Sequence, residues 1–514
     1  MFKGHPKGLI AAALANMGER FGYYIMNAVL VLFLCSKFGL SEETSGTIYS
    51  FFYAGIYLLA LVGGAIADRT QNYKGTIRTG LIIMATGYVL LSIPILATST
   101  NIAWLLPLTC FALFMIAFGN GLFKGNLQAI VGQLYDDFEA EAAKQGPEAL
   151  KIAKSKRDSG FQIFYVFINV GGLIAPFIAP LLREWWLGAN GMAYNAQLPA
   201  LCHEFINNGA QMSQAALDNL NALMTAAGGN VAELTSACQN YLQIFNEGIH
   251  YSFIASVVAM VISLIIFVAY QRRFPTPGKK TKVESQSYTA EEKRAMAKEI
   301  KQRMAALFAV LGIVIFFWFS FHQNGIARDF VDSSAVAPEI WQAINPFFVI
   351  TLTPIVMALF AWLSRRGKEI STPRKIAIGM FIAGLAFLFL VIYSALKGYP
   401  SADDFKLLPV AEQMSQKAHW WVLIVTYFFL TVAELFISPL GLSFVSKVAP
   451  KHLLGLCQGL WLGATALGNL LLWIGPLMYN AWPIWQCWAV FFAVCLISMG
   501  VMLGMLKWLE RVAE

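Results

Sequence analysis

Charged residues are scarce in this sequence. Only 13% of its 514 residues are Asp, Glu, Lys or Arg, whereas hydrophobic residues make up 58%. A soluble protein of this length carries about 25% charged residues. The scarcity of charge excludes a soluble globular domain, and we predict an integral membrane protein.

Motifs for catalysis and metal binding are also missing. The sequence has no P-loop, G-x-S-x-G, H-E-x-x-H or C-x-x-C pattern, and its seven cysteines lack the spacing of metal ligands. We therefore expect no enzyme activity, no cofactor, no metal site and no ATP-driven pump within the chain. The net charge of +8 is spread over loops, so we expect no nucleic-acid partner.

Long apolar runs dominate instead. A run of about 20 apolar residues spans the hydrocarbon core of a bilayer. Twelve such runs predict an all-α protein with twelve transmembrane helices, and they lie at residues 8–35, 42–67, 77–99, 102–132, 159–184, 248–271, 304–325, 339–364, 373–397, 418–446, 453–480 and 483–508.

Lys and Arg are distributed unevenly between the two sides of the predicted membrane. They concentrate before the first span, in alternate loops after it, and in the connector at the middle of the chain. The opposite side has only Lys37, Arg183, Arg328, Lys397, Lys406 and Lys417. Because positively charged loops stay in the cytoplasm, we expect both termini to be cytoplasmic.

The order of the spans divides the chain into two six-helix halves. We expect an N-terminal half of residues 1–184 plus 248–271, and a C-terminal half of residues 304–514. Residues 272–303 form a cytoplasmic connector whose Lys/Glu-rich run is a solvated linker helix or, less favoured, an amphipathic helix on anionic lipid.

An extracytoplasmic insert, residues 185–247, lies between the fifth and sixth spans. It contains no Lys or Arg, and its apolar periodicity predicts a small helical cap. The insert also contains Cys202 and Cys238. In an oxidising compartment the two would form a disulfide, and two unpaired thiols are the alternative.

A charged motif follows the second span. Residues 64–74 read G-A-I-A-D-R-T-Q-N-Y-K, which is similar to the cytoplasmic G-x-x-x-D-R-x-x-x-[KR] signature of the major facilitator superfamily. Two halves of six spans joined by a cytoplasmic connector also fit that fold. An Asp at a helix end can hold two helices together in one state and release them in another. We predict a conformational latch formed by Asp68, Arg69 and Lys74.

The first span contains two adjacent charges, Glu19 and Arg20. A charge at the centre of a bilayer costs about 2.5–3.5 kcal/mol even on the most lenient scale, so such residues usually face a cavity or the interior of the bundle. Asn16, Tyr23 and Asn27 extend the polar stripe around Arg20. The stripe indicates a functional cavity, and a structural ion pair is the alternative.

Further polar stretches lie in later spans. They read F-K-G-N at 123–126, F-Y-V-F-I-N-V-G at 164–171, I-N-P at 344–346 and A-E-L-F-I-S-P-L-G-L-S at 433–443, with Trp461 in the eleventh span. Together with N-M-G-E-R-F-G-Y-Y at 16–24, they resemble, in order, the motifs of the proton-dependent oligopeptide transporter family. The similarity runs from Asn16 to Asn469, and it implies the major facilitator fold.

The resemblance implies a central cavity that binds a zwitterionic peptide between the halves. Arg20, Lys124 and Asn169 would receive the carboxylate of the peptide, and Glu434 and Asn345 its amino group. Opposite charges on opposite walls suit a substrate that has a charge of each sign at its ends. For Asn169, a hydrogen bond between helices is the alternative.

The resemblance also implies aromatic side-chain pockets lined by Tyr24, Tyr57 and Trp461. Aromatic walls accept varied side chains because they offer apolar area without a fixed hydrogen-bond pattern. Ordinary packing is the alternative for Tyr57 and Trp461.

Three positions depart from the family pattern. Asn16 and His322 stand where the family has acids, and Asn27 stands where it commonly has an arginine. Asn16 cannot titrate, whereas a histidine with its ordinary pKa of about 6.5 can titrate near neutral pH. The candidates for proton coupling and gating are therefore Glu19, His322 and Glu434, and we favour His322 at the outer end of the seventh span. For His322, a neutral histidine hydrogen-bonded in the helix interface is the alternative.

The sequence therefore predicts a secondary active importer of di- and tripeptides in a bacterial inner membrane, with protons and membrane lipid as partners. One alternative is transport of another anionic, zwitterionic or modified-peptide solute with altered or no proton coupling, which the three departures suggest. Another is a non-transporting membrane sensor built on a transporter scaffold.

Overall fold

The computed structural model describes residues 4–98, 100–276, 290–323, 327, 331, 338–408 and 416–513. These residues are helical almost throughout, and the single β-bridge among them joins Val331 to Ala418. The predicted all-α fold is confirmed, because the described residues contain 12 helices long and apolar enough to cross a membrane.

The spans follow the predicted order. Six form the N-terminal half: α1 (Leu9–Phe38), α2 (Glu42–Thr70), α3 (Tyr73–Ser92), α4 (Ile102–Ala143), α5 (Pro147–Ala189) and α8 (Leu234–Tyr270). Six form the C-terminal half: α10 (Ala290–Phe321), α12 (Pro338–Arg365), α13 (Thr372–Lys397), α16 (Trp420–Val448), α17 (Leu454–Leu470) with its continuation α18 (Ile474–Ala481), and α19 (Ile484–Gly504). A short helix, α20 (Leu506–Ala513), follows.

Local sequence explains where several spans begin and end. The side chains of Ser41 and Asn72 accept hydrogen bonds from backbone N–H groups in the first turns of α2 and α3, at 3.2 and 3.0 Å. These caps satisfy donors that have no partner within the helix. Gly39 ends α1 in the left-handed conformation, with φ of 65°, which glycine adopts without strain.

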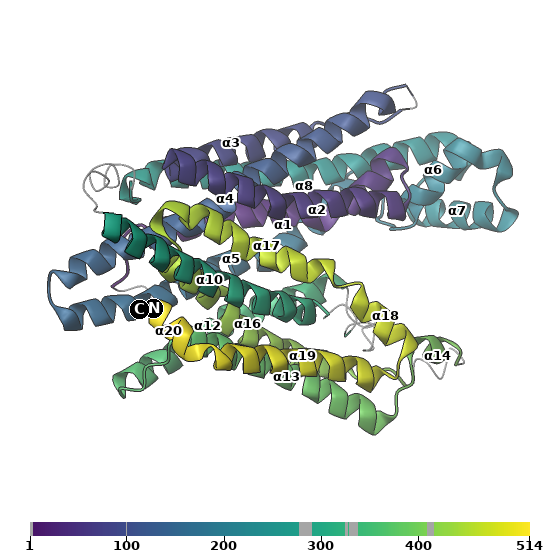
Figure 1. The fold of residues 1–514 in the computed structure, drawn as a ribbon. Helices are drawn as coiled ribbons and strands as arrows, with labels where there is room; N and C mark the ends of the chain where they lie inside the picture. Colours follow the sequence, from purple (N-terminus) through teal and green to yellow (C-terminus); the bar gives the residue numbers. More distant parts are fainter. Residues whose placement is uncertain are drawn as a thin grey trace.

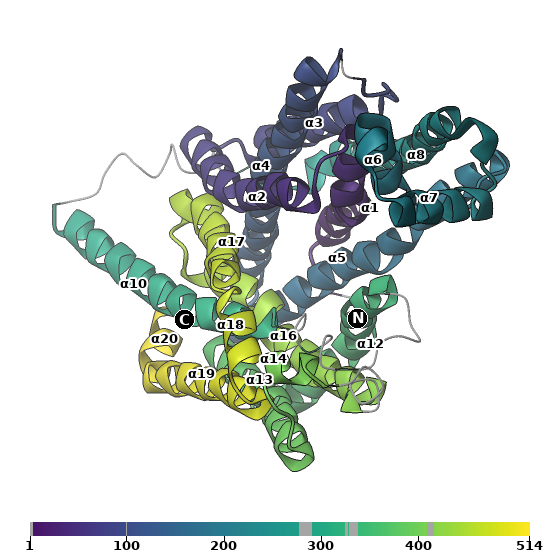
Figure 2. The ribbon, with the colours of Figure 1, turned by 90° about the vertical axis from the view of Figure 1, so that its right-hand side faces the viewer.

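The two halves lie side by side and both termini lie at one end of the molecule (Figure 1). The view from the opposite end shows α5 of the N-terminal half reaching toward α12 and α16 of the C-terminal half (Figure 2). The halves also meet where α17 packs against α2 and α4. The substrate cavity predicted from the sequence would therefore be bounded by α1, α2, α4 and α5 on one side and α10, α12, α16 and α17 on the other.

Two spans are longer than the hydropathy pattern predicts. We expected spans at 102–132 and 159–184, whereas α4 continues to Ala143 and α5 begins at Pro147. The extra turns form a helical hairpin beyond the membrane. Several of its charged residues are paired within it, among them Arg157 with Asp136 and Glu139, so charge did not end the helices there.

The insert forms the predicted helical cap at the end opposite the termini (Figure 1). It contains α6 (Leu198–Asn208) and α7 (Gln214–Ala226), and because α8 already begins at Leu234, the cap is shorter than residues 185–247. Cys202 of α6 and Cys238 of α8 are both fully buried free thiols.

The connector is only partly described. Residues 277–289 lie outside the described residues. The Lys/Glu-rich run from residue 291 to 298 belongs to the first turns of α10, which continues without a break into the seventh span. The expected separate linker helix is thus an extension of a transmembrane helix.

Candidate functional site

The charged pair of the first span lies in the interior of the N-terminal half. Arg20 donates to both oxygens of Glu19 through Nε and a terminal nitrogen, each at 2.6 Å. Asn120 of α4 donates to Glu19 Oε1 at 2.6 Å, and the guanidinium lies 4.6 Å from the centre of the Tyr23 ring. Glu19 is 0% and Arg20 4% exposed. Burial of both charges is possible because each is neutralised by the other and further hydrogen-bonded.

Glu434 of α16 is held by a different kind of contact. Tyr165 of α5 donates its hydroxyl to one carboxylate oxygen, and Asn345 of α12 donates to the other at 2.6 Å. Thr431 accepts a second hydrogen bond from Asn345 at 3.1 Å. No Lys or Arg among the described residues pairs with Glu434, so its charge is balanced only by neutral donors. Tyr165 also links the two halves at this point.

Lys124 of α4 is a cation without a carboxylate. Among the described residues it makes no hydrogen bond or ion pair, and its ammonium lies 5.5 Å from the centre of the Tyr57 ring. The guanidinium of Arg20 lies 6.0 Å from the centre of the Tyr24 ring. The structure thus brings Arg20 near Tyr24 and Lys124 near Tyr57 within the N-terminal half.

Two predicted residues have mainly structural contacts. Asn169 donates to the carbonyl of Tyr165 on its own helix at 3.0 Å. Trp461 is 3% exposed and packs on Gly441, where a Cβ would lie 1.9 Å from the indole ring. The contact of Trp461 fits its packing alternative, whereas the hydrogen bond of Asn169 stays within α5 and is not the bond between helices that was its alternative.

A chain of polar contacts crosses between the halves near His322. Asn469 of α17 lies beside His322 and donates to the hydroxyl of Tyr53 on α2 at 3.4 Å. The Tyr53 and Tyr57 hydroxyls are 3.0 Å apart. The His322 ring stacks on Trp318 at 5.0 Å, and its Nδ1 is buried without a hydrogen-bond partner among the described atoms.

The predicted latch residue Asp68 contacts the opposite half through backbone groups. Its two carboxylate oxygens accept from the N–H groups of Gly455 and Leu456 at 2.9 and 2.8 Å, in the first turn of α17. Tyr73 donates to the same carboxylate. A helix N-terminus attracts an anion through its unpaired N–H groups and its dipole.

The cations of that motif lie elsewhere. Arg69 is exposed, and Lys74 donates to Thr276 at 2.8 Å. The expected Asp–cation latch is therefore a contact between an Asp and a helix N-terminus.

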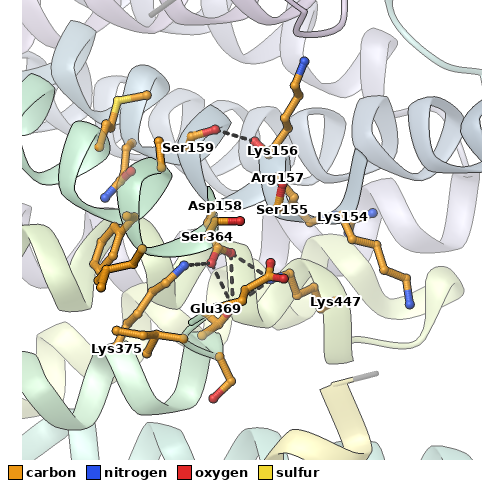
Figure 3. A pocket seen from close by; sticks show the side chains of 18 of the residues that line it. Lys154, Ser155, Lys156, Arg157, Asp158, Ser159, Ser364, Glu369, Lys375 and Lys447 are labelled. Carbon is orange, nitrogen blue, oxygen red and sulfur yellow. Dashed lines mark hydrogen bonds and ion pairs between the residues drawn. The ribbon is translucent and has the colours of Figure 1, made fainter. Parts of the chain in front are cut away.

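A second cross-half cluster surrounds Asp158 of α5, and sequence reasoning missed it (Figure 3). Lys375 of α13 and Lys447 of α16 each donate to Asp158 at 2.7 Å. Ser443 and Thr372 donate to it as well, at 2.7 and 3.1 Å. Asp158 is thus the centre of a cluster of two lysines and two hydroxyls from the C-terminal half.

The neighbouring Arg157 extends this cluster. It pairs with Asp136 and Glu139 of α4 at 2.6 and 2.8 Å, and it donates to the carbonyl of Ser446 in the opposite half at 3.2 Å. The contacts of Asp68, Arg157 and Asp158 all lie at the cytoplasmic ends of the helices. The structure therefore describes an arrangement in which the two halves are joined at the cytoplasmic side.

The chain is similar to known peptide permeases. It is 26% identical over 484 residues to dipeptide and tripeptide permease B of Salmonella typhimurium, covering 91% of this chain and 85% of the permease. It is 28% identical over 483 residues to dipeptide and tripeptide permease A of Salmonella typhi, covering 91% and 83%.

Its fold is similar to that of a solved POT family transporter in complex with 5-aminolevulinic acid. The TM-score is 0.57 at 19% identity, with 100% of this chain and 98% of that chain covered. Twelve spans and bacterial relatives identify an integral, multi-pass protein of the inner membrane. The family model described as PTR2, POT family, matches residues 74–291 and 285–484, and the chain belongs to this family.

Proposed function

We propose that this protein imports di- and tripeptides by alternating access and that a proton gradient drives the import. The observation that carries the proposal is the separation of charge between the halves. Arg20 and Lys124 are cations of the N-terminal half, and Glu434, which pairs with no described Lys or Arg, lies in the C-terminal half. A zwitterionic peptide complements both walls at once.

The two cations differ in what they offer a substrate. Glu19 already neutralises Arg20 with two hydrogen bonds, whereas Lys124 pairs with no carboxylate in the part of the chain that the structure describes. We therefore assign the carboxylate of the peptide to Lys124, with Arg20 as its positively charged neighbour. The amino group of the peptide would bind Glu434, where it would displace or join the present neutral donors, Tyr165 and Asn345.

Peptide analogues test these two poles. Binding of dialanine to purified protein is expected to weaken on the order of tenfold when its amino group is acetylated or its carboxylate amidated, because each change removes a charge-assisted hydrogen bond. In the Lys124→Gln variant the amide and the free acid are expected to bind equally. Analogues that bind as well as dialanine would contradict the assignment.

Proton coupling in this chain rests on an altered set of residues. Glu19 is paired with Arg20, and Asn16 cannot carry a proton. We propose that protonation of His322 biases the outer gate. Asn469, which lies beside His322, connects it to Tyr53 in the opposite half. Uptake as a function of external pH tests this role in wild type and His322→Gln. Superimposed pH profiles would contradict it and leave Glu19 or Glu434 as the carrier.

The names of the relatives do not favour the alternatives. Both relatives are named as dipeptide and tripeptide permeases. The ligand in the solved relative, 5-aminolevulinic acid, has one amino group and one carboxylate, as a peptide does.

A further inference from the structure

A large cavity lies at the cytoplasmic end of the molecule, outside the predicted substrate site (Figure 3). Its volume is about 1130 Å³. One wall is the start of α5 in the N-terminal half, and the other is the end of α12 with the start of α13 in the C-terminal half. An occupant of this cavity would therefore contact both halves.

The α12 wall is apolar in its deeper part. Pro354, Met357, Ala358 and Ala361 line it. The same helix has large apolar side chains on its exposed surface, among them Ile355 at 63%. In a membrane-spanning helix such a surface faces lipid, so the apolar wall of the cavity is continuous with a surface that faces acyl chains.

The acidic groups of the cavity are mostly bonded already. Asp158 is held by Lys375 and Lys447, as described above. Glu510 accepts from Ser371 and lies 3.4 Å from a nitrogen of Arg374. Glu369, exposed at the rim, adds one negative charge.

Two cations of the cavity lining have only neutral partners among the described residues. Lys156 of α5 donates to the carbonyl of Gly4 at 2.9 Å. Arg365 of α12 donates through Nε to the carbonyl of Ala361 at 3.3 Å, which leaves both of its terminal nitrogens without a partner among the described residues. Burial and the charge of Lys156 lower the pKa of His5 to about 4, so this lining residue is neutral at neutral pH.

We propose that this cavity binds the headgroup of an anionic phospholipid from the cytoplasmic leaflet. Lys156 and Arg365 hold the phosphate from opposite halves, and an acyl chain lies along the apolar wall of α12. Arg offers a planar fork of donors that matches phosphate oxygens, and basic pockets between helices on the cytoplasmic side suit such headgroups.

This binding has a consequence for the transport cycle. The N-terminal and C-terminal walls adjoin because the halves are joined at the cytoplasmic side. A ligand that binds only one arrangement stabilises that arrangement by mass action. Anionic lipid is therefore expected to favour the cytoplasm-closed arrangement. The proposal does not depend on the identity of the transported solute.

Native mass spectrometry of the full-length protein with phosphatidylglycerol or phosphatidylcholine tests the proposal. Wild type is expected to retain phosphatidylglycerol in preference to phosphatidylcholine, and Arg365→Gln to retain it about tenfold less, the loss expected for one charge-assisted hydrogen bond. Lys156→Gln is expected to have the same effect. Arg366→Gln is the matched control, because the adjacent Arg366 lies over the Trp362 ring at 4.1 Å and does not line the cavity.

A thermal-shift series completes the test. Phosphatidylglycerol is expected to raise the melting temperature of wild type and Arg366→Gln but not of Arg365→Gln, and glycerophosphate at the same concentration to raise none of them. Equal retention of phosphatidylglycerol by wild type and Arg365→Gln would overturn the proposal. An equal stabilisation by glycerophosphate would overturn it too, because it would show a site for free phosphate groups rather than for lipid.

Discussion

At the scale of single residues, the buried charges differ in how they are balanced. Glu19 and Arg20 neutralise each other within one helix, Glu434 is balanced by neutral donors, and Lys124 has no counterion among the described residues. A paired charge is inert toward a ligand, whereas an unbalanced charge gains a partner when a ligand of opposite charge arrives. The unbalanced groups are therefore those that we expect to respond most to substrate.

Breaking the Glu19–Arg20 pair is expected to destabilise the protein. Glu19→Gln leaves the guanidinium buried without a counterion, which costs about 3–5 kcal/mol in comparable cases. The double variant Glu19→Gln/Arg20→Gln should lose less than the sum of the single variants, because neither charge then remains unpaired. Unfolding in detergent measures this cycle.

The exposed pair between Glu299 and Arg303 provides the control. Its atoms are 2.9 Å apart, but the side chains are 59% and 29% exposed. Glu299→Gln should therefore change stability by no more than about 1 kcal/mol. Additive losses of stability in the double-mutant cycle of Glu19 and Arg20 would show that the two residues do not act as a pair.

At the scale of helices, the two cytoplasmic contacts occupy equivalent places in the two halves. In one, the junction of the second and third spans contacts the start of the eleventh through Asp68. In the other, the start of the ninth span contacts the start of the fifth through Lys375 and Asp158. The second contact uses an ion pair where the first uses helix N–H groups, so the same position in the fold is joined by different chemistry.

Asp158→Asn is expected to weaken the cytoplasmic contact. Lys375 and Lys447 of the C-terminal half would then lose the counterion that the N-terminal half supplies, and the loss of this attraction favours separation of the halves. Spin labels on the α4–α5 hairpin and the α12–α13 loop should report a larger population at long distance. Glu148→Gln is the control, because Glu148 lies exposed in the first turn of α5. An unchanged distance distribution in Asp158→Asn would contradict a role of the Asp158 cluster in holding the cytoplasmic side closed.

The cap offers a second test at this scale. Cys202 and Cys238 are both buried on the contacting helices α6 and α8, and we predict that they form a disulfide in protein purified without reductant. Closing this loop would stabilise the cap by very roughly 4 kcal/mol on the chain-entropy model. Mass mapping settles the question, and alkylatable thiols at both positions would contradict the prediction.

Hydropathy was sufficient to find all twelve spans, because a membrane requires about 20 apolar residues in each. It did not find the extra turns of α4 and α5, because these turns carry charges, some of which are paired across the hairpin, as Arg157 is with Asp136 and Glu139. Tyr165 was missed as a partner of Glu434, since the two are 269 residues apart in the chain. The partners of Asp68 are backbone N–H groups, which no side-chain pattern displays.

At the scale of the whole molecule, the two halves are held together at the cytoplasmic side, and the charged walls of the candidate cavity lie deeper in the membrane. Transport by alternating access requires these cytoplasmic contacts to break and others to form at the outer side. The Asn469–Tyr53 contact, which already crosses between the halves, is a place where the outer side can begin to close. The substrate would then be enclosed between Lys124 and Glu434.

The central claim is proton-driven import of small peptides. It is tested most directly by uptake of labelled dialanine into proteoliposomes that contain the purified protein, with and without an inward proton gradient. We predict that dialanine accumulates inside above the external concentration when the gradient is present. This accumulation should be lost when a protonophore collapses the gradient. Equal uptake with and without the gradient, or no dialanine uptake at all, would contradict it.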